Sequence, residues 1–156
     1  MVTQAKIVEN PTGRIDHVVA ILGGRAAFKD KIATRLDVHR AIEHGLPTAI
    51  LTDLVRNVVL MRDSDTLHKA LGTFYHQKDS AAPKTLSKEQ SGAIWKFAEI
   101  LVIATEIFGS QKAAEHWLTE PAIGLDRMRP IDLLSTAPGA ELVETYLNQI
   151  EYGVYV

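Results

Sequence analysis

Apolar positions recur with the period of an α-helix along most of the chain. Between residues 47 and 59 the apolar side chains are three or four positions apart: Ile50, Leu51, Leu54, Val55, Val58 and Val59. Residues 138–151 repeat this spacing with a predicted core face of Leu142, Val143, Tyr146, Leu147 and Ile150. The run HVVAIL at residues 17–22 is the one stretch that also suits a β-strand. The pattern therefore predicts an all-α fold.

Glycine, proline and capping residues mark the predicted helix ends. A helix over 26–44 would end at Gly45, Pro47 would be the first residue of the next helix, and a short helix would follow over about 65–71. Ser87 and Gln90 form an S-x-x-Q capping box, which predicts a helix from Ser87 to Gly109. Shorter helices are expected over 110–118 and from Pro130, and a last one from Pro138 to Glu151.

The predicted helix over 87–108 carries two apolar stripes instead of one. The first is Ile94, Phe97, Leu101, Ala104 and Phe108, and the second is Trp95, Ala98 and Val102. A helix on the surface of a core needs only one such stripe. We therefore expect this helix to lie at the centre of its domain, although burial in an oligomer interface would give the same pattern.

A polar segment at residues 76–85, HQKDSAAPKT, is the best candidate for a linker, and it predicts two parts, 1–85 and 86–156. Residues 1–86 have 12 Lys and Arg against 9 Asp and Glu, whereas residues 87–156 have 5 against 10. The net charges of +3 and −5 suggest that the halves face different partners, and chance would also produce a difference of this size.

The composition is that of a globular protein, with 46% hydrophobic and 23% charged residues in 156. The chain contains no cysteine, which excludes disulfides and fits a reducing compartment. The beginning of the sequence lacks the apolar region of a signal peptide, and the longest apolar run, Ile100 to Ala104, is too short to span a membrane. We expect a cytoplasmic protein without membrane contact.

Residues 37–71 have the length of a helix-turn-helix. Its second helix would present Thr66, His68 and Lys69 to DNA, with Lys78 following. Asp63 and Asp65 would repel the phosphates, and the segment supplies few of the cations that DNA binding requires. A plain helical hairpin with a structural role remains the alternative.

The motifs of common enzyme classes are missing. The sequence has no G-x-S-x-G, no G-x-x-x-x-G-K-[ST] and no H-E-x-x-H, and its histidines are scattered. We therefore expect neither catalysis nor a metal or other cofactor.

The chain ends on IEYGVYV, an apolar and aromatic segment that either folds back on the core or contacts another protein. Residues 86–156 resemble the toxin-binding domain of Xre/MbcA/ParS-type antitoxins. The resemblance rests on an ordered set of motifs: Phe108-Gly109, A-x-x-W-L at 114–118, Pro121, P-x-D-L-L-x-T at 130–136, Gly139, V-x-x-x-L at 143–147 and the terminal I-E-Y-G-x-Y.

This resemblance implies an antitoxin that binds a RES-domain toxin, an enzyme that degrades NAD+, and covers the entrance of its active site. The tail would make the toxin contact through Glu151, Tyr152, Gly153, Val154, Tyr155 and Val156. Family members dimerise, and their helix-turn-helix represses the operon. The T-L-x-R-R-like basic run of the family is Thr66 to Ala70 here and lacks the arginines. A helix-turn-helix regulator without a toxin partner is the alternative function.

Overall fold

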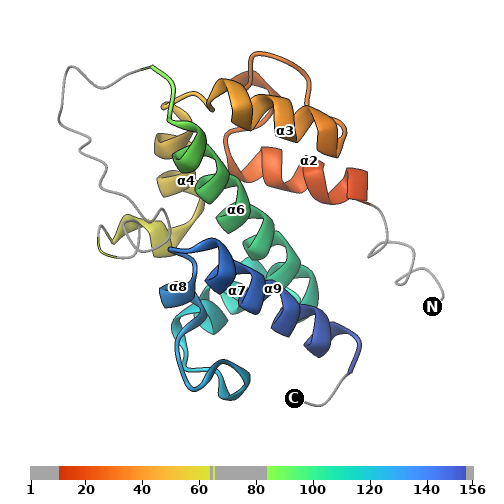
Figure 1. Cartoon of the computed structure of the whole chain (residues 1–156), viewed down its shortest axis with the longest axis vertical. Helices are drawn as coiled ribbons and strands as arrows, with labels where there is room; N and C mark the ends of the chain where they lie inside the picture. The colour runs from red at the N-terminus through yellow and green to blue at the C-terminus, as the bar shows by residue number, and fades with distance from the viewer. Residues whose placement is uncertain (1–10, 64, 66–83, 154–156) are drawn as a thin grey trace.

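The part of the fold that the structure describes consists of helices and the loops between them (Figure 1). The computed structural model describes residues 11–63, 65 and 84–153. The α-helices are α2 (Pro11–Ile21), α3 (Arg35–His44), α4 (Ile50–Asn57), α6 (Lys88–Phe108), α7 (Gln111–Thr119), α8 (Pro130–Leu133) and α9 (Ala137–Glu151). Three 3-10 helices accompany them: η1 (Arg25–Ala27), η2 (Val59–Arg62) and η3 (Ile123–Leu125). No β-strand occurs in these ranges, in agreement with the all-α prediction. Among the helices described, none is both long and apolar enough to cross a membrane.

Helix α6 forms the centre of the molecule (Figure 1). It contacts α2 and α3 from the N-terminal part of the chain and α7 and α9 from the C-terminal part. Both of its apolar stripes are buried except for Phe108, which is half-buried. A single hydrophobic cluster includes buried side chains from α2, α6, α7 and α9, and partly buried side chains of α3 pack against it. The prediction of a central helix is confirmed.

Local sequence sets both ends of α6. The Ser87 hydroxyl accepts a hydrogen bond from the Gln90 N–H at 3.1 Å, and the Gln90 side chain accepts one from the Ser87 N–H at 3.1 Å. At the other end Gly109 has a φ of 92°, a left-handed conformation that suits glycine, and its N–H donates to the Thr105 carbonyl at 2.9 Å. The predicted capping box and helix end are confirmed.

The predicted continuous helix over 26–44 is wrong in its first half. After η1 the backbone is extended at Phe28, and α3 begins only after Thr34. Thr34 and Asp37 form a capping box, in which the Asp37 carboxylate also accepts a hydrogen bond from the Ala33 N–H at 3.0 Å. The side chains of Phe28 and Ile32 are buried, but both residues belong to the loop between η1 and α3 and not to a helix. The predicted helix end at Gly45 is confirmed.

One further prediction about the N-terminal part is wrong, and one alternative is settled. The HVVAIL run, which also suited a strand, belongs mostly to α2, in agreement with the all-α prediction. Pro47 lies outside α4, in a segment that pairs with residues 84–86: the Thr48 N–H donates to the Lys84 carbonyl at 2.9 Å, and the Leu86 N–H donates to the Leu46 carbonyl at 2.8 Å. This pairing holds Pro47 in a β-bridge, and α4 begins only after the turn at residues 48–49.

The predicted helix over 65–71 and the predicted linker over 76–85 lie mostly outside the described residues. The boundary between residues 85 and 86 remains a prediction. The described residues on its two sides belong to one hydrophobic cluster.

Candidate functional site

The predicted toxin-binding tail follows the last turn of α9. Thr136 begins this helix by accepting a hydrogen bond from the Gly139 N–H at 3.1 Å. At the other end the Tyr152 N–H donates to the Asn148 carbonyl at 3.0 Å, and Gly153 has a φ of 70°. Glycine suits this left-handed conformation, in which the chain leaves the helix.

The six predicted toxin-binding residues are described only in part. Glu151 is half-buried at the end of α9, and Tyr152 and Gly153 are exposed beyond it. Val154, Tyr155 and Val156 lie outside the described residues. The structure thus places the first half of the predicted contact at an accessible helix end.

Helix α9 has one buried face, and the prediction included one wrong residue in it. Val143 and Leu147 are fully buried, whereas Leu142 is 57% exposed. Neighbouring helical residues point about 100° apart, so the helix that buries Val143 turns Leu142 toward solvent. Tyr146 and Ile150 are half-buried at the edge of the core.

Three aromatic rings connect α6, α7 and α9. The ring centroids of Phe108 and Trp117 are 5.4 Å apart, and those of Trp117 and Tyr146 are 6.2 Å apart. Leu118, the neighbour of Trp117 in the chain, is fully buried. Gly124 of η3 packs so closely on the Tyr146 ring that a Cβ atom there would overlap it. The aromatic rings therefore fix η3 against α9.

The loop around η3 is closed by hydrogen bonds and presents two apolar side chains to solvent. The Ala122 N–H donates to the Met128 carbonyl at 3.0 Å, and the Arg127 N–H donates to the Ala122 carbonyl at 2.8 Å. Ile123 is 82% exposed and Met128 is 45% exposed. Neither residue is part of the site predicted from the sequence, although apolar residues in a loop without helical periodicity were a visible signal.

Comparison with known proteins identifies this region. Residues 104–153 match the family model described as the antitoxin Xre/MbcA/ParS C-terminal toxin-binding domain. This part of the chain is a toxin-binding domain of the Xre/MbcA/ParS antitoxin type. An "Antitoxin Xre" from Pseudomonas putida KT2440 is 26% identical over 123 residues, which cover 79% of this chain and 76% of that protein. An "Antitoxin Xre" from Yersinia enterocolitica is 34% identical over 68 residues, 43% of this chain and 46% of that protein.

The match to an antitoxin domain agrees with the expectation that the chain is not an enzyme. The matched segment begins inside α6 and ends at Gly153, so it includes the aromatic rings, the η3 loop and the beginning of the tail. The exposed side chains described above therefore lie in the toxin-binding domain of the antitoxin.

A cluster of charged residues connects this domain with the N-terminal helices of the antitoxin. Glu99 of α6 is 6% exposed, and its carboxylate lies 3.0 Å from the Lys96 ammonium and 3.5 Å from the Arg35 guanidinium of α3. Lys96 also reaches Glu144 of α9 at 3.0 Å. Burial alone would lower the pKa of Lys96, but the carboxylates of Glu99 and Glu144 outweigh it and raise this pKa above its ordinary value.

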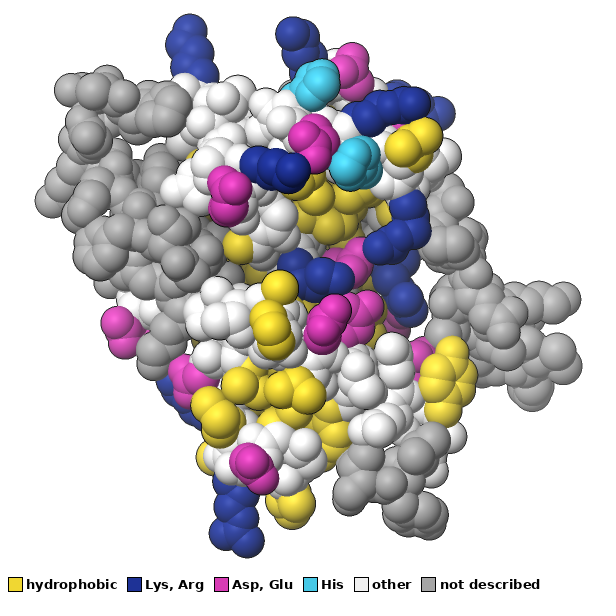
Figure 2. Space-filling view, viewed as in Figure 1, with side chains coloured by type: hydrophobic (Ala, Val, Ile, Leu, Met, Phe, Trp, Pro, Cys, Tyr) yellow, Lys and Arg dark blue, Asp and Glu magenta, His cyan; other side chains and the backbone are white. Residues whose placement is uncertain are grey.

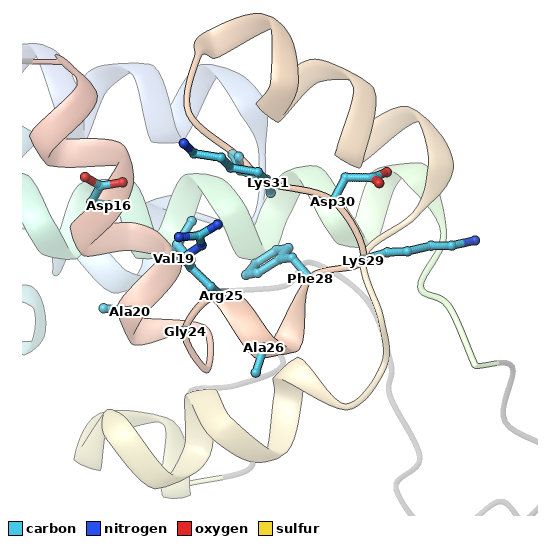
Figure 3. A pocket seen from close by; sticks show the side chains of 11 residues that line it. Asp16, Val19, Ala20, Gly24, Arg25, Ala26, Phe28, Lys29, Asp30 and Lys31 are labelled. Carbon is cyan, nitrogen blue, oxygen red and sulfur yellow. The ribbon is translucent and has the colours of Figure 1, made fainter.

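The predicted DNA-binding residues Thr66, His68, Lys69 and Lys78 all lie outside the described residues. The described N-terminal part offers an open pocket of about 660 Å³ between α2, η1 and the loop that follows (Figure 3). In Figure 3 the side chains of Asp16, Arg25 and Lys31 lie around this space, whereas Lys29 and Asp30 point away from it. Side chains of both charges line the pocket. All of its lining residues lie between Asp16 and Ile32, before the matched domain in the sequence.

Proposed function

We propose that this antitoxin neutralises a RES-domain toxin that degrades NAD+, by covering the entrance of the toxin's active site with Glu151–Val156. The observation that supports this is the position of Tyr152, which is 71% exposed at the end of α9 within a domain of the toxin-binding family. An exposed aromatic side chain at a helix end is available to another protein without any rearrangement of the fold.

The chemistry of the tail suits such a target. Tyr152, Tyr155 and Val156 would each contribute about 1.5–3 kcal/mol if fully buried against the toxin, and fixing the tail in one conformation would offset most of this gain, at about 1–2 kcal/mol per residue. Tyrosine also brings a hydroxyl group for a specific hydrogen bond. An enzyme that binds the anionic pyrophosphate of NAD+ needs a positive cleft. The half of the antitoxin that carries the tail has a net charge of −5, which complements such a cleft.

The test is deletion of residues 152–156, followed by titration of the truncated and full-length antitoxins into the toxin while NAD+ consumption is measured. We expect the truncated protein to leave the toxin active at concentrations at which the full-length protein silences it. A matched control replaces the same five residues by Gly and Ser, which keeps the length and removes the side chains. Full protection by both variants would refute the proposal.

We also infer that the antitoxin acts in the cytoplasm as a homodimer that binds operator DNA through Thr66, His68, Lys69 and Lys78. Support comes from the net charge of +3 on residues 1–86 and from the helix-turn-helix length of residues 37–71. Without the arginines of the family's basic run, each chain makes few contacts, and a dimer gains affinity because two sites bind together.

Lys69→Ala should weaken operator binding for all sequences alike and reduce the slope of log affinity against log salt by about 1. Lys112→Ala, in the exposed part of α7, is the matched control and should change neither. An unchanged slope for Lys69→Ala would place the phosphate contacts elsewhere.

A further inference from the structure

We propose that the antitoxin holds its toxin chiefly through an apolar anchor made of Ile123, Met128 and Leu142, and that the tail serves to block the active site. The anchor is thus a second contact surface, on the η3 loop and the outer face of α9. The inference rests on the proposed function, because the occupant of the anchor is the same toxin.

The first argument is where the exposed apolar side chains lie. The described residues include six large hydrophobic side chains that are exposed: Leu36, Val59, Ile123, Met128, Leu142 and Tyr152. The last four all lie within residues 104–153, the segment that matches the toxin-binding domain. Figure 2 shows the same uneven distribution, with hydrophobic side chains gathered over the C-terminal helices and charged ones over the N-terminal helices. Apolar groups concentrated in this way mark a surface that another protein covers.

The second argument is that the members of the anchor adjoin one another. Gly124 packs on the Tyr146 ring, so Ile123, its neighbour in the chain, is held beside α9. Leu142 precedes Tyr146 by one helical turn and therefore lies on the same face of α9. Backbone hydrogen bonding between Ala122 and Met128 brings Met128 next to Ile123 across the loop. The η3 loop, with Ile123 and Met128, thus lies against the part of α9 that carries Leu142, one helical turn before Tyr146.

The third argument is that the loop is fixed before the toxin arrives. Asp126 and Arg127 both have positive φ angles, 54° and 62°, although neither is glycine. The left-handed conformation costs roughly 1–2 kcal/mol per residue. The hydrogen bonds between Ala122, Leu125, Arg127 and Met128 maintain it. An interface loop that is already ordered loses little conformational entropy on binding. Little of the free energy gained by burying Ile123 is therefore offset by the cost of ordering the loop.

Charge and position identify the toxin, and not a second antitoxin, as the occupant. Three exposed carboxylates, Glu120, Asp126 and Glu141, lie near the anchor in the chain, with Arg127 as the exposed cation among them. Two copies of this mostly acidic rim would repel each other, whereas the rim complements a protein whose substrate site is positive. Leu142 and the beginning of the tail lie on the same helix, α9, so a toxin seated on the anchor would have its active site within reach of residues 152–156.

The test distinguishes binding of the toxin by the anchor from inhibition of its active site by the tail. Ile123→Glu and Leu142→Glu place a charge in the anchor, and Val59→Glu is the matched control, because Val59 is 62% exposed and lies outside the matched domain. The dissociation constant is measured by calorimetry with the purified RES-domain toxin that co-purifies with the wild-type chain, and NAD+ consumption is measured in parallel. All three substituted side chains are exposed, and thermal unfolding verifies that the variants fold.

We expect each anchor variant to raise the dissociation constant at least about tenfold, which is 1.4 kcal/mol, while saturating amounts still silence the toxin. The variant lacking residues 152–156 should show the opposite, near wild-type affinity without inhibition. Wild-type affinity in both anchor variants overturns the anchor and leaves the proposed blocking by the tail intact. If the anchor variants change the oligomeric mass of the free antitoxin and leave its affinity for the toxin unchanged, the anchor is a contact between copies of the antitoxin and the proposal is wrong. Failure of the wild-type chain to bind or inhibit any RES-domain toxin overturns the proposed function itself.

Discussion

The charged cluster around Glu99 gives a prediction that can be worked out from the geometry. Lys96→Met removes the ammonium group that lies 3.0 Å from the Glu99 carboxylate and keeps a side chain of similar length. Glu99 stays buried, and its remaining cation is Arg35, at 3.5 Å and with a side chain that is 73% exposed. The substitution therefore leaves a carboxylate in the core with weak compensation.

The expected loss of stability follows from the burial of the two groups. Removing one partner of a fully buried ion pair costs about 3–5 kcal/mol, and we expect about 2–3 kcal/mol here because water screens the partly exposed Lys96. Lys96→Met combined with Glu99→Met should return stability close to that of the wild type, because two apolar side chains fill the same space without a buried charge. Glu144 loses its partner in both variants but is half-buried and remains hydrated.

Urea unfolding followed by circular dichroism at pH 7 gives the free energy of unfolding for each variant. Lys88→Met is the control, because it breaks the 2.7 Å pair with Glu43 at the surface and should change stability little. The reasoning is refuted if the double variant is as unstable as Lys96→Met alone, or if Lys96→Met is no more destabilising than Lys88→Met.

Three more predictions follow from single contacts. Gly124→Ala should force the Tyr146 ring to move and lower stability by about 1–3 kcal/mol, and combining it with Tyr146→Ala should give less than the sum of the two single effects in urea unfolding. Asp37→Asn should destabilise the protein at pH 7. Backbone hydrogen bonds from Ala33 and Thr34 lower the pKa of Asp37 below its ordinary value of 3.8. The stabilisation by this carboxylate is therefore present above pH 3.8 and is lost as the pH falls through the lower pKa of the folded protein. In acid, the free energies of unfolding of the wild type and of Asp37→Asn should converge. Ser87→Ala should cost about 0.5–2 kcal/mol through loss of the cap on α6, and an unchanged urea midpoint would contradict this.

The sequence predicted those elements whose signals are local. The Ser87–Gln90 box and Gly109 determine α6, because capping and a left-handed glycine act within a few residues. The two apolar stripes of α6 correctly indicated burial on most sides. The last helix also follows its proline and its periodic apolar residues to Glu151.

The errors arose where contacts across the fold compete with local preference. Residues 26–34 carry helix-forming residues, but Phe28 and Ile32 are buried from an extended loop, and α3 starts at the cap of Thr34. The T-x-x-D pattern at 34–37 was a visible sign of that start. Pro47 was assigned to a helix because its pairing partner, Thr85, lies far away in the chain.

Of the proposed toxin contact, the sequence suggested only the tail, and this role of the tail remains a prediction. The tail is contiguous in sequence and has an unusual composition, so it could be recognised without a structure. The anchor could not, because it depends on Gly124 resting on Tyr146 and on two non-glycine residues with positive φ. Which side of α9 faces solvent depends on its packing in the fold, so Leu142 was assigned to the core.

The position of α6 makes the two ends of the antitoxin depend on each other. This helix is covered by α2 and α3 on one part of its surface and by α7 and α9 on another. If a protease cut the chain ahead of Ser87 and α2 and α3 dissociated, the side chains of α6 that they cover would be exposed to water, and the packing of α6 against α9 would be weakened. Loss of the N-terminal helices would thus release a bound toxin, although no residue that contacts the toxin had been changed.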